Sequence, residues 1–221
     1  MPLQLLPLEE SDIDAQSEIN WRAFKPGIMG VLFPTGYTPE DRAWMKASTL
    51  RDWHLHPGTY RAFKVIDTDL PPDDPLRQIV GTAKWKVYPS ERTQDELDAA
   101  DKEAEAGGRP PNAGPALKAF GEACGRNKKE ILGGKPYMLL HVLGTHPEHQ
   151  RRGVGSLHLQ WGKDEADRLG LPMYLESSPE GKAVYEKHGF EFVKWLEWDA
   201  REFGHRDACR HAIMMRPAKR V

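Results

Sequence analysis

The chain has 221 residues, 39% hydrophobic and 29% charged, with 31 basic side chains against 33 acidic ones. This length suits one domain with an insertion rather than two domains, and the composition excludes global disorder. A net charge of −2 gives no general attraction to nucleic acid or to an anionic membrane, so we expect neither as a partner. The two distant cysteines give no sign of a disulfide framework or a zinc site.

No segment approaches the ~20 apolar residues of a membrane span, and residues 1–6 lack the features of a secretory signal. We therefore expect an intracellular, cytoplasmic protein. No heptad or self-pairing motif indicates an oligomeric state.

The first third of the chain carries strand and helix signals in turn. Residues 3–6 predict a short strand, and Ser11-Asp12 offers an N-cap to a helix that Pro26-Gly27 ends. A loop rich in glycine and proline follows. Thr38-Pro39-Glu40 then predicts a second helix, with proline at its first position.

Residues 60–66 and 78–88 predict two strands that pair as an antiparallel hairpin through a loop at 71–75. The second strand alternates, which places Thr82, Lys84 and Lys86 together on one face.

The composition of residues 90–136 differs from that of the rest of the chain. We predict that these residues form an insertion within a single domain that covers residues 1–221. Residues 91–106 hold seven acidic and two basic side chains and predict a solvated helix rather than an acidic docking surface. Residues 115–132 predict a second helix.

The C-terminal half alternates between strands and helices. Residues 137–145 are almost continuously apolar, as in a central strand, and residues 153–169 show helical spacing closed by Gly170. We predict further strands at 173–176, 189–198 and 210–216. We also predict one short helix at 178–187, whose N-cap would be Ser178. The expected fold class is α+β with mixed strand pairing.

The turn Gln150-Arg151-Arg152-Gly153-Val154-Gly155-Ser156 joins the central strand to its helix. Its two glycines let backbone N–H groups approach a ligand at a helix N-terminus, which is a phosphate-binding arrangement. The turn does not fit the Rossmann pattern, because the first glycine of Gly-x-Gly-x-x-Gly is missing. It does not fit the P-loop pattern either, because no Gly-Lys-Ser/Thr sequence follows.

This turn resembles motif A of the GCN5-related N-acetyltransferases (GNAT), and Tyr185-Glu186-Lys187-His188-Gly189-Phe190 resembles the family's Tyr-x-x-x-Gly-Phe element. The run Glu176 to Gly181 is most similar to fungal members. The resemblance covers residues 137–193 strongly and the first 88 residues by element order. It implies the GNAT fold, with a mostly antiparallel central sheet flanked by helices and a helical insertion between the third and fourth strands.

The resemblance also implies acetyl-CoA as cosubstrate and an amine as acceptor, with no metal. The pyrophosphate would lie on the turn amides of Gln150 to Gly155, beside Ser156. The pantetheine would pair with the strand end at Leu143, Gly144 and Thr145, with Ser178 near it, although Ser178 before Pro179 is also a simple cap.

Three residues are candidates for the chemistry. By resemblance, Tyr185 protonates the leaving thiolate; the alternative is a core tyrosine. His141 is the first candidate for the general base, since imidazole titrates near neutral pH. With the pKa of a free imidazole, it would give the pH profile of activity an acidic limb at roughly pH 6 to 7. The alternative is a buried structural histidine. Glu176 is the competing base.

The acceptor is not determined by the sequence. Five aromatic residues flank the first two helices, namely Trp21, Phe24, Phe33, Tyr37 and Trp44, so an aromatic or apolar amine is one expectation, and a protein N-terminus or lysine stays open. A non-catalytic acyl-CoA sensor is the rival from another class. His146, His149 and His158 lack an evident carboxylate or cysteine partner, so we predict no metal site.

Overall fold

The computed structural model describes residues 2–71 and 78–219. In these residues the strands form a seven-stranded sheet in the order β1-β2-β3-β4-β5-β7-β6. All neighbours pair antiparallel except β4 and β5, which are parallel. The bounds of the strands are β1 Leu3–Pro7, β2 Tyr60–Asp67, β3 Ile79–Tyr88, β4 Tyr137–Thr145, β5 Met173–Ser177, β6 Glu191–Trp195 and β7 Ala212–Arg216.

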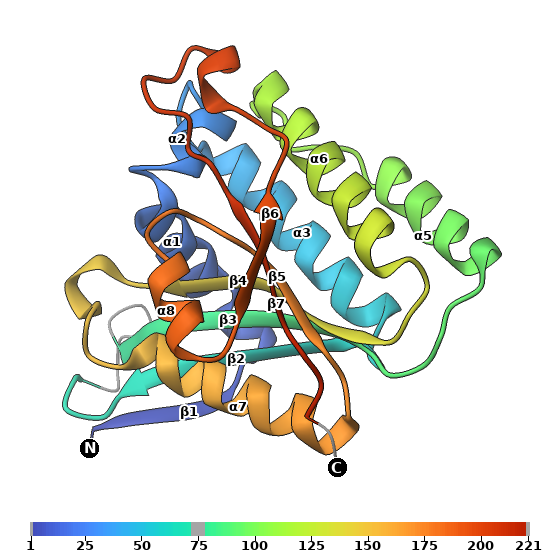
Figure 1. Cartoon of the computed structure of the whole chain (residues 1–221). Coiled ribbons are helices and arrows are strands. Elements are labelled where there is room, and N and C mark those ends of the chain that lie inside the picture. Colours follow the sequence, from blue (N-terminus) through green and yellow to red (C-terminus); the bar gives the residue numbers. More distant parts are fainter. Residues whose placement is uncertain (1, 72–77, 220–221) are drawn as a thin grey trace.

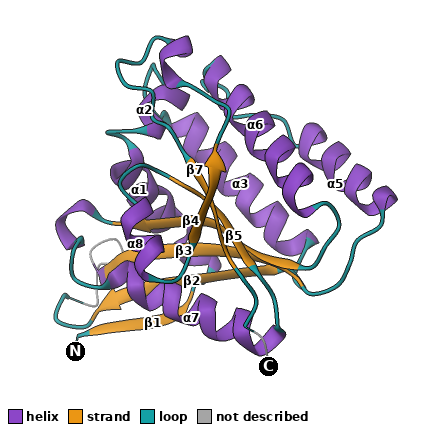
Figure 2. Cartoon of the chain, viewed as in Figure 1, coloured by secondary structure: helices purple, strands orange, loops and turns teal. Residues whose placement is uncertain are grey.

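Helices cover both faces of this sheet (Figures 1 and 2). Their bounds are α1 Ile13–Phe24, α2 Ile28–Leu32, α3 Pro39–Leu55, α5 Gln94–Ala106, α6 Pro115–Leu132, α7 Val154–Leu169 and α8 Lys182–Lys187, with short 3-10 helices at Glu10–Asp12, Pro147–His149 and Ala200–Phe203. The mixed α+β fold that the sequence predicts is therefore confirmed. None of the described helices is long and apolar enough to cross a membrane.

Each face of the sheet carries its own apolar core. On one face, Trp85 of β3 and Met138 of β4 pack with Leu159 of α7. On the other face, Leu139 of β4 and Tyr174 of β5 pack with α2 and α6. We call these the α7 face and the α6 face.

The insertion differs between its two helices. Helix α5 buries no residue and begins at Thr93, whose side chain accepts a hydrogen bond from the Glu96 N–H, so it is the solvated acidic helix that its composition predicts. Helix α6 instead buries Ala116, Ala123 and Leu132 in the core of the α6 face. This half of the insertion thus helps to cover the sheet.

Several sequence predictions of local structure are corrected. The loop before Thr38 contains the short helix α2, and the last two strands are shorter than 189–198 and 210–216. Ser178 does not cap α8, which begins at Lys182 with Gly181 as N-cap. The Ser178 Oγ accepts a 3.3 Å hydrogen bond from the Gly181 N–H and so closes the preceding turn. The predicted loop at 71–75 lies, beyond residue 71, outside the described residues.

Candidate active site

The two central strands separate into a fork. β4 and β5 pair only at Met138 with Met173 and at Leu139 with Tyr174, although β4 continues to Thr145. Beyond Leu139, the side of β4 that faces β5 therefore has no strand partner in the described chain, while its other side pairs with β3. Figure 1 shows the two strands diverging. An extended ligand can hydrogen-bond to such an open edge.

A β-bulge lies at the start of the fork. Trp85 pairs with Leu140 and Lys84 pairs with Val142, which leaves His141 as the extra residue of β4. A bulge re-aims a side chain and raises the local twist, and bulges are common beside active sites. The side chain of His141 is exposed to water.

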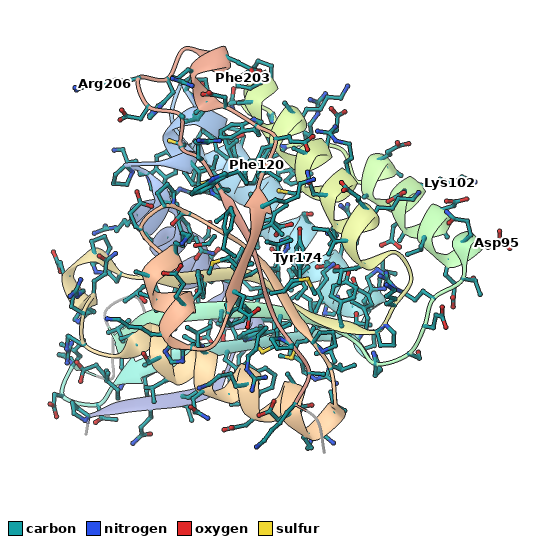
Figure 3. All side chains as sticks on the ribbon, in the orientation of Figure 1. Asp95, Lys102, Phe120, Tyr174, Phe203 and Arg206 are labelled. Carbon is teal, nitrogen blue, oxygen red and sulfur yellow. The ribbon has the colours of Figure 1, made fainter. Side chains whose placement is uncertain are left out.

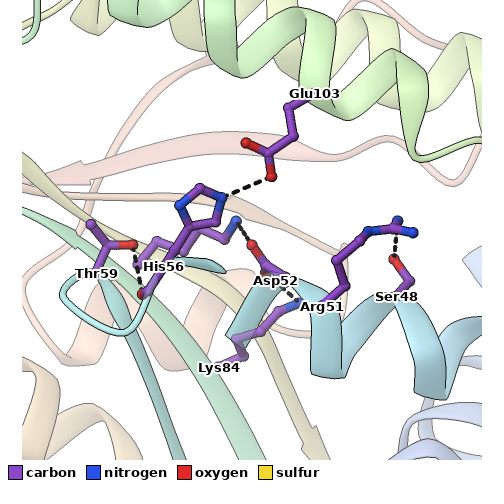
Figure 4. Close-up of polar contacts among 8 residues, drawn as sticks. Ser48, Arg51, Asp52, His56, Thr59, Lys84 and Glu103 are labelled. Carbon is purple, nitrogen blue, oxygen red and sulfur yellow. Dashed lines mark hydrogen bonds and ion pairs between the residues drawn. The ribbon is translucent and has the colours of Figure 1, made fainter. Parts of the chain in front are cut away.

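Lysines lie next to His141 on the α6 face. Lys84 and Lys86 share Asp52 of α3, with Nζ to carboxylate oxygen distances of 3.8 Å and 2.7 Å. Figure 4 shows Lys84 and Asp52 at the end of α3, where His56 also bonds to Glu103 of α5. The Lys84 side chain is only 15% exposed, and burial lowers its pKa to about 8.

The positive charge of Lys84 is the main reason that the pKa of His141 falls well below its usual value; desolvation and the charges of Lys86 and Lys128 add to this. His141 is water-accessible but closely surrounded by protein, as in an open recess. The imidazole is thus neutral, and able to accept a proton, across the physiological range. If His141 is the base, the acidic limb of the pH-rate profile should therefore lie at a lower pH than the roughly 6 to 7 expected from a free imidazole.

Glu176 lies on the same face, on β5. Burial raises the pKa of this carboxyl group, against the lowering effect of Lys128 on α6. The Glu176 Oε1 and the Tyr174 hydroxyl are both buried without a hydrogen bond of normal length and angle to a described residue, although Tyr174 acts on Glu176 to lower its pKa. Together with Lys84 and His141, these side chains line what we call the polar recess.

Tyr185 lies on the α7 face instead. Its ring packs edge-on against Phe190, with ring centroids 5.8 Å apart, and joins the core of that face. Gly181 leaves room for this ring, because a Cβ there would lie 2.9 Å from Tyr185 Cε2 and 3.2 Å from Ser177 Oγ. Burial raises the pKa of Tyr185 above its usual value. The sheet thus places Tyr185 on one face and His141 with Glu176 on the other.

The turn before α7 is shaped to receive an anion. Gly153 is the N-cap of α7 and has φ 88°, and Arg151 also has a positive φ of 63°. A Cβ on Gly153 would meet nothing within 4 Å, and one on Gly155 only Leu143 Cδ2 at 3.9 Å, so the surface over the helix N-terminus is open. These residues fit the pyrophosphate of a nucleotide-like cosubstrate.

The other predicted turn residues have structural contacts as well. Arg152 donates a 2.6 Å hydrogen bond to the buried Asp67, and Gln150 donates one of 3.4 Å to the carbonyl oxygen of Thr145. Ser156 Oγ lies 3.1 Å from His188 Nε2. The side chain of Val154 is buried in the core. Arg152 is therefore committed to holding the turn against β2.

The histidines near the turn divide into two sets. His158 is fully buried in α7, whereas the ligand atoms of His146, Glu148 and His149 lie within 4.8 Å of one another. The expectation that no carboxylate stands near these histidines is wrong, because Glu148 does. His149 Nδ1 is, however, 2.7 Å from Arg152 NH1, so a metal at that nitrogen would have to displace the arginine.

A small cavity of about 140 Å³ lies between α1, α2, α3 and β4. Its lining is mainly apolar and includes Phe24, Tyr37 and Val142, so two of the five aromatic residues noted in the sequence face it. Val142 adjoins His141 and pairs with Lys84. One wall of the cavity therefore adjoins the polar recess in β4.

The family model for the acetyltransferase (GNAT) family matches residues 78–190, which contain the bulge, the fork, the turn and Tyr185. The chain belongs to this family. The GNAT fold inferred from the two sequence motifs is thus confirmed.

Two solved structures and one sequence relative show the range of similar proteins. The histone acetyltransferase HPA2 and related acetyltransferase from Corynebacterium glutamicum is 16% identical with a TM-score of 0.62, over 100% of this chain and 99% of that one. The PaiA N-acetyltransferase from Thermoplasma acidophilum, in complex with coenzyme A, is 13% identical with a TM-score of 0.52, over 98% and 99%. A probable acyltransferase, SID5, from Ajellomyces capsulatus is 45% identical over 42 residues, which are 19% of this chain and 31% of that relative's length.

Sequence reasoning did not identify Lys128, Tyr174 or Asp52 as residues near the chemistry. The alternation of β3 did place Lys84 and Lys86 on one face, which was the available signal. Nothing in the sequence shows that α3 and α6 cover that face.

Proposed function

We propose that this protein transfers an acetyl group from acetyl-CoA to an amine by direct attack in a ternary complex. The observation that carries the proposal is the fork, with its bulge at His141, where candidate groups for the two proton transfers lie on opposite faces of the sheet. An amine can then approach from the α6 face while the thiol departs on the α7 face. Bound acetyl-CoA would supply an activated thioester.

The turn and the open edge of β4 position the cosubstrate in this proposal. The N–H groups at the start of α7, between Gly153 and Ser156, bind the pyrophosphate with the charge of Arg151. The backbone from Leu143 to Thr145 pairs with the pantetheine. Ser178, which closes the turn after β5, lies at the other side of the fork.

His141 accepts the proton of the attacking amine. Its depressed pKa keeps the ring neutral and free to accept a proton, and also makes it a weaker base than a free imidazole. Glu176 is the competing base, and its raised pKa brings it closer to the working pH. Tyr185 retains its proton because burial raises its pKa, so its hydroxyl can donate to the thiolate as negative charge develops on sulfur.

The experiment is release of free thiol from acetyl-CoA across a panel of amines and peptides. We expect amine-dependent release that falls in Tyr185→Phe and in His141→Gln. Binding of acetyl-CoA without accelerated release from any acceptor would instead support a non-catalytic acyl-CoA sensor. Preference for a peptide N-terminus or a lysine would make the protein a protein acetyltransferase. The cytoplasmic location and the absence of a metal, a nucleic-acid partner and a membrane partner stay predictions.

A further inference from the structure

The polar recess contains buried polar atoms that the protein itself does not satisfy. Glu176 Oε1 and the Tyr174 hydroxyl lack a hydrogen bond of normal length and angle to any described residue, and each polar group of this pair acts on the other. Tyr174, labelled in Figure 3, is fully buried in the core of the α6 face. Buried polar groups in native proteins are nearly always paired, so each exception needs an explanation. A polar ligand that enters the recess would supply the missing partners.

The recess also carries positive charge in excess. Lys84 and Lys86 have one carboxylate between them, and Asp52 lies closer to Lys86. Lys128 acts electrostatically on both His141 and Glu176, yet no carboxylate of the described residues lies within 4.0 Å of its ammonium group. Its neighbour Lys129 faces Asp98 and Asp101 at 3.9 Å and 3.8 Å. Lys84 therefore has only the Asp52 carboxylate that it shares with Lys86, at 3.8 Å, and Lys128 on α6 has no close counter-ion among the described residues.

This charge bears on which amine can bind. A simple amine is cationic in water, and three lysines near His141 repel it. An acceptor that also carries a carboxylate brings a second counter-ion, beside Asp52, to the three lysines. Lys84 pairs across the strands with Val142, which lines the apolar cavity, so a carboxylate at the lysines and an apolar side chain in the cavity can belong to one small molecule.

We propose that Lys84 and Lys128 form an anion subsite that binds a carboxylate on the acceptor, so that the acceptor is an amino acid rather than a simple amine. The inference rests on the proposed acetyl transfer and adds a substrate class to it. Helix α6 of the insertion then supplies part of the acceptor site.

The test compares amines that differ only in the carboxylate. Phenylalanine, phenylalanine amide and phenethylamine form one set, and leucine, leucine amide and isopentylamine form a second. We expect kcat/KM for the amino acid to exceed that of the amide and of the decarboxylated amine by about tenfold or more, mainly through KM. In Lys128→Met and Lys84→Met this preference should fall about tenfold.

Lys129→Met is the matched control, because Lys129 is the next residue on α6 and is exposed. It should keep the preference of the wild type. A stabilisation by acetyl-CoA equal to that of the wild type shows that each variant is folded and can bind the cosubstrate.

Equal kcat/KM for acid, amide and decarboxylated amine overturns the subsite while leaving acetyl transfer intact. A preference that survives in both Lys128→Met and Lys84→Met overturns the assignment to these lysines. No thiol release with any amine or peptide contradicts the proposed function itself, and the subsite with it.

Discussion

Replacing Tyr185 with phenylalanine removes one hydroxyl and should separate catalysis from binding. The ring packs against Phe190 and Gly181, and these contacts remain in Tyr185→Phe. Loss of the hydroxyl should change the free energy of unfolding by less than about 1 kcal/mol. Acetyl-CoA binding should stay within about threefold of the wild type, because the turn before α7 is on another element.

The effect on turnover should be far larger. A positioned general acid contributes about 10² to 10⁴ in rate, which corresponds to about 2.7 to 5.4 kcal/mol of activation free energy at 1.36 kcal/mol per decade. We expect kcat to fall by at least about a hundredfold, measured as thiol release under saturating substrates. Tyr88→Phe is the control, since Tyr88 lies at the end of β3, where it pairs with Tyr137 and its ring contacts Arg92.

A Tyr185→Phe enzyme with kcat within about threefold of the wild type would refute the acid role. Loss of acetyl-CoA binding and of stability together would also contradict the reasoning, because it would make Tyr185 a packing residue.

Three further predictions concern His141, Glu176 and Gly162. If His141 is the base, the acidic limb of kcat/KM in the wild type lies below the range of a free imidazole, and Lys84→Met moves it to higher pH, since a positive charge beside the imidazole is lost. A limb that does not move in a pH-rate series argues against this base. The pKa of Glu176 is higher in the folded protein than in the unfolded chain, so its contribution to stability is complete below the unfolded-state pKa and is lost as pH rises through the folded-state pKa. The melting temperature of Glu176→Gln should therefore rise relative to that of the wild type as pH rises above about 4.5. A constant difference in melting temperature from about pH 4 to 8 would contradict the assignment. In Gly162→Ala the new Cβ would lie 2.4 Å from the Trp85 ring, so overpacking should cost about 1 to 3 kcal/mol in urea unfolding; an unchanged midpoint would show that α7 moves away freely.

Local signals in the sequence account for most of the fold. Thr38 and Thr93 both cap their helices through the side chain, and the apolar run at 137–145 is the central strand β4. These features depend on neighbours in the chain, so periodicity and cap chemistry predict them. Helix α2 has only five residues, which is too short for its periodicity to distinguish it from a loop.

The sequence predicts only part of the candidate site. The turn and Tyr185 belong to motifs, and His141 is the titratable residue of its strand. The surroundings of His141 depend on tertiary packing, because Lys128 comes from the insertion and Asp52 from α3. The low pKa of His141 could therefore not be predicted from the free imidazole.

The most direct test of the central claim is the change in melting temperature with acetyl-CoA, with ATP and NAD as controls. At a hundredfold excess over its dissociation constant, a ligand stabilises the native state by about 2.7 kcal/mol, or about 5 to 10 °C for a chain of this size. We expect such a shift with acetyl-CoA and none with ATP or NAD. No shift at millimolar acetyl-CoA would mean that the turn and the fork are structural features, and would contradict the acetyltransferase proposal.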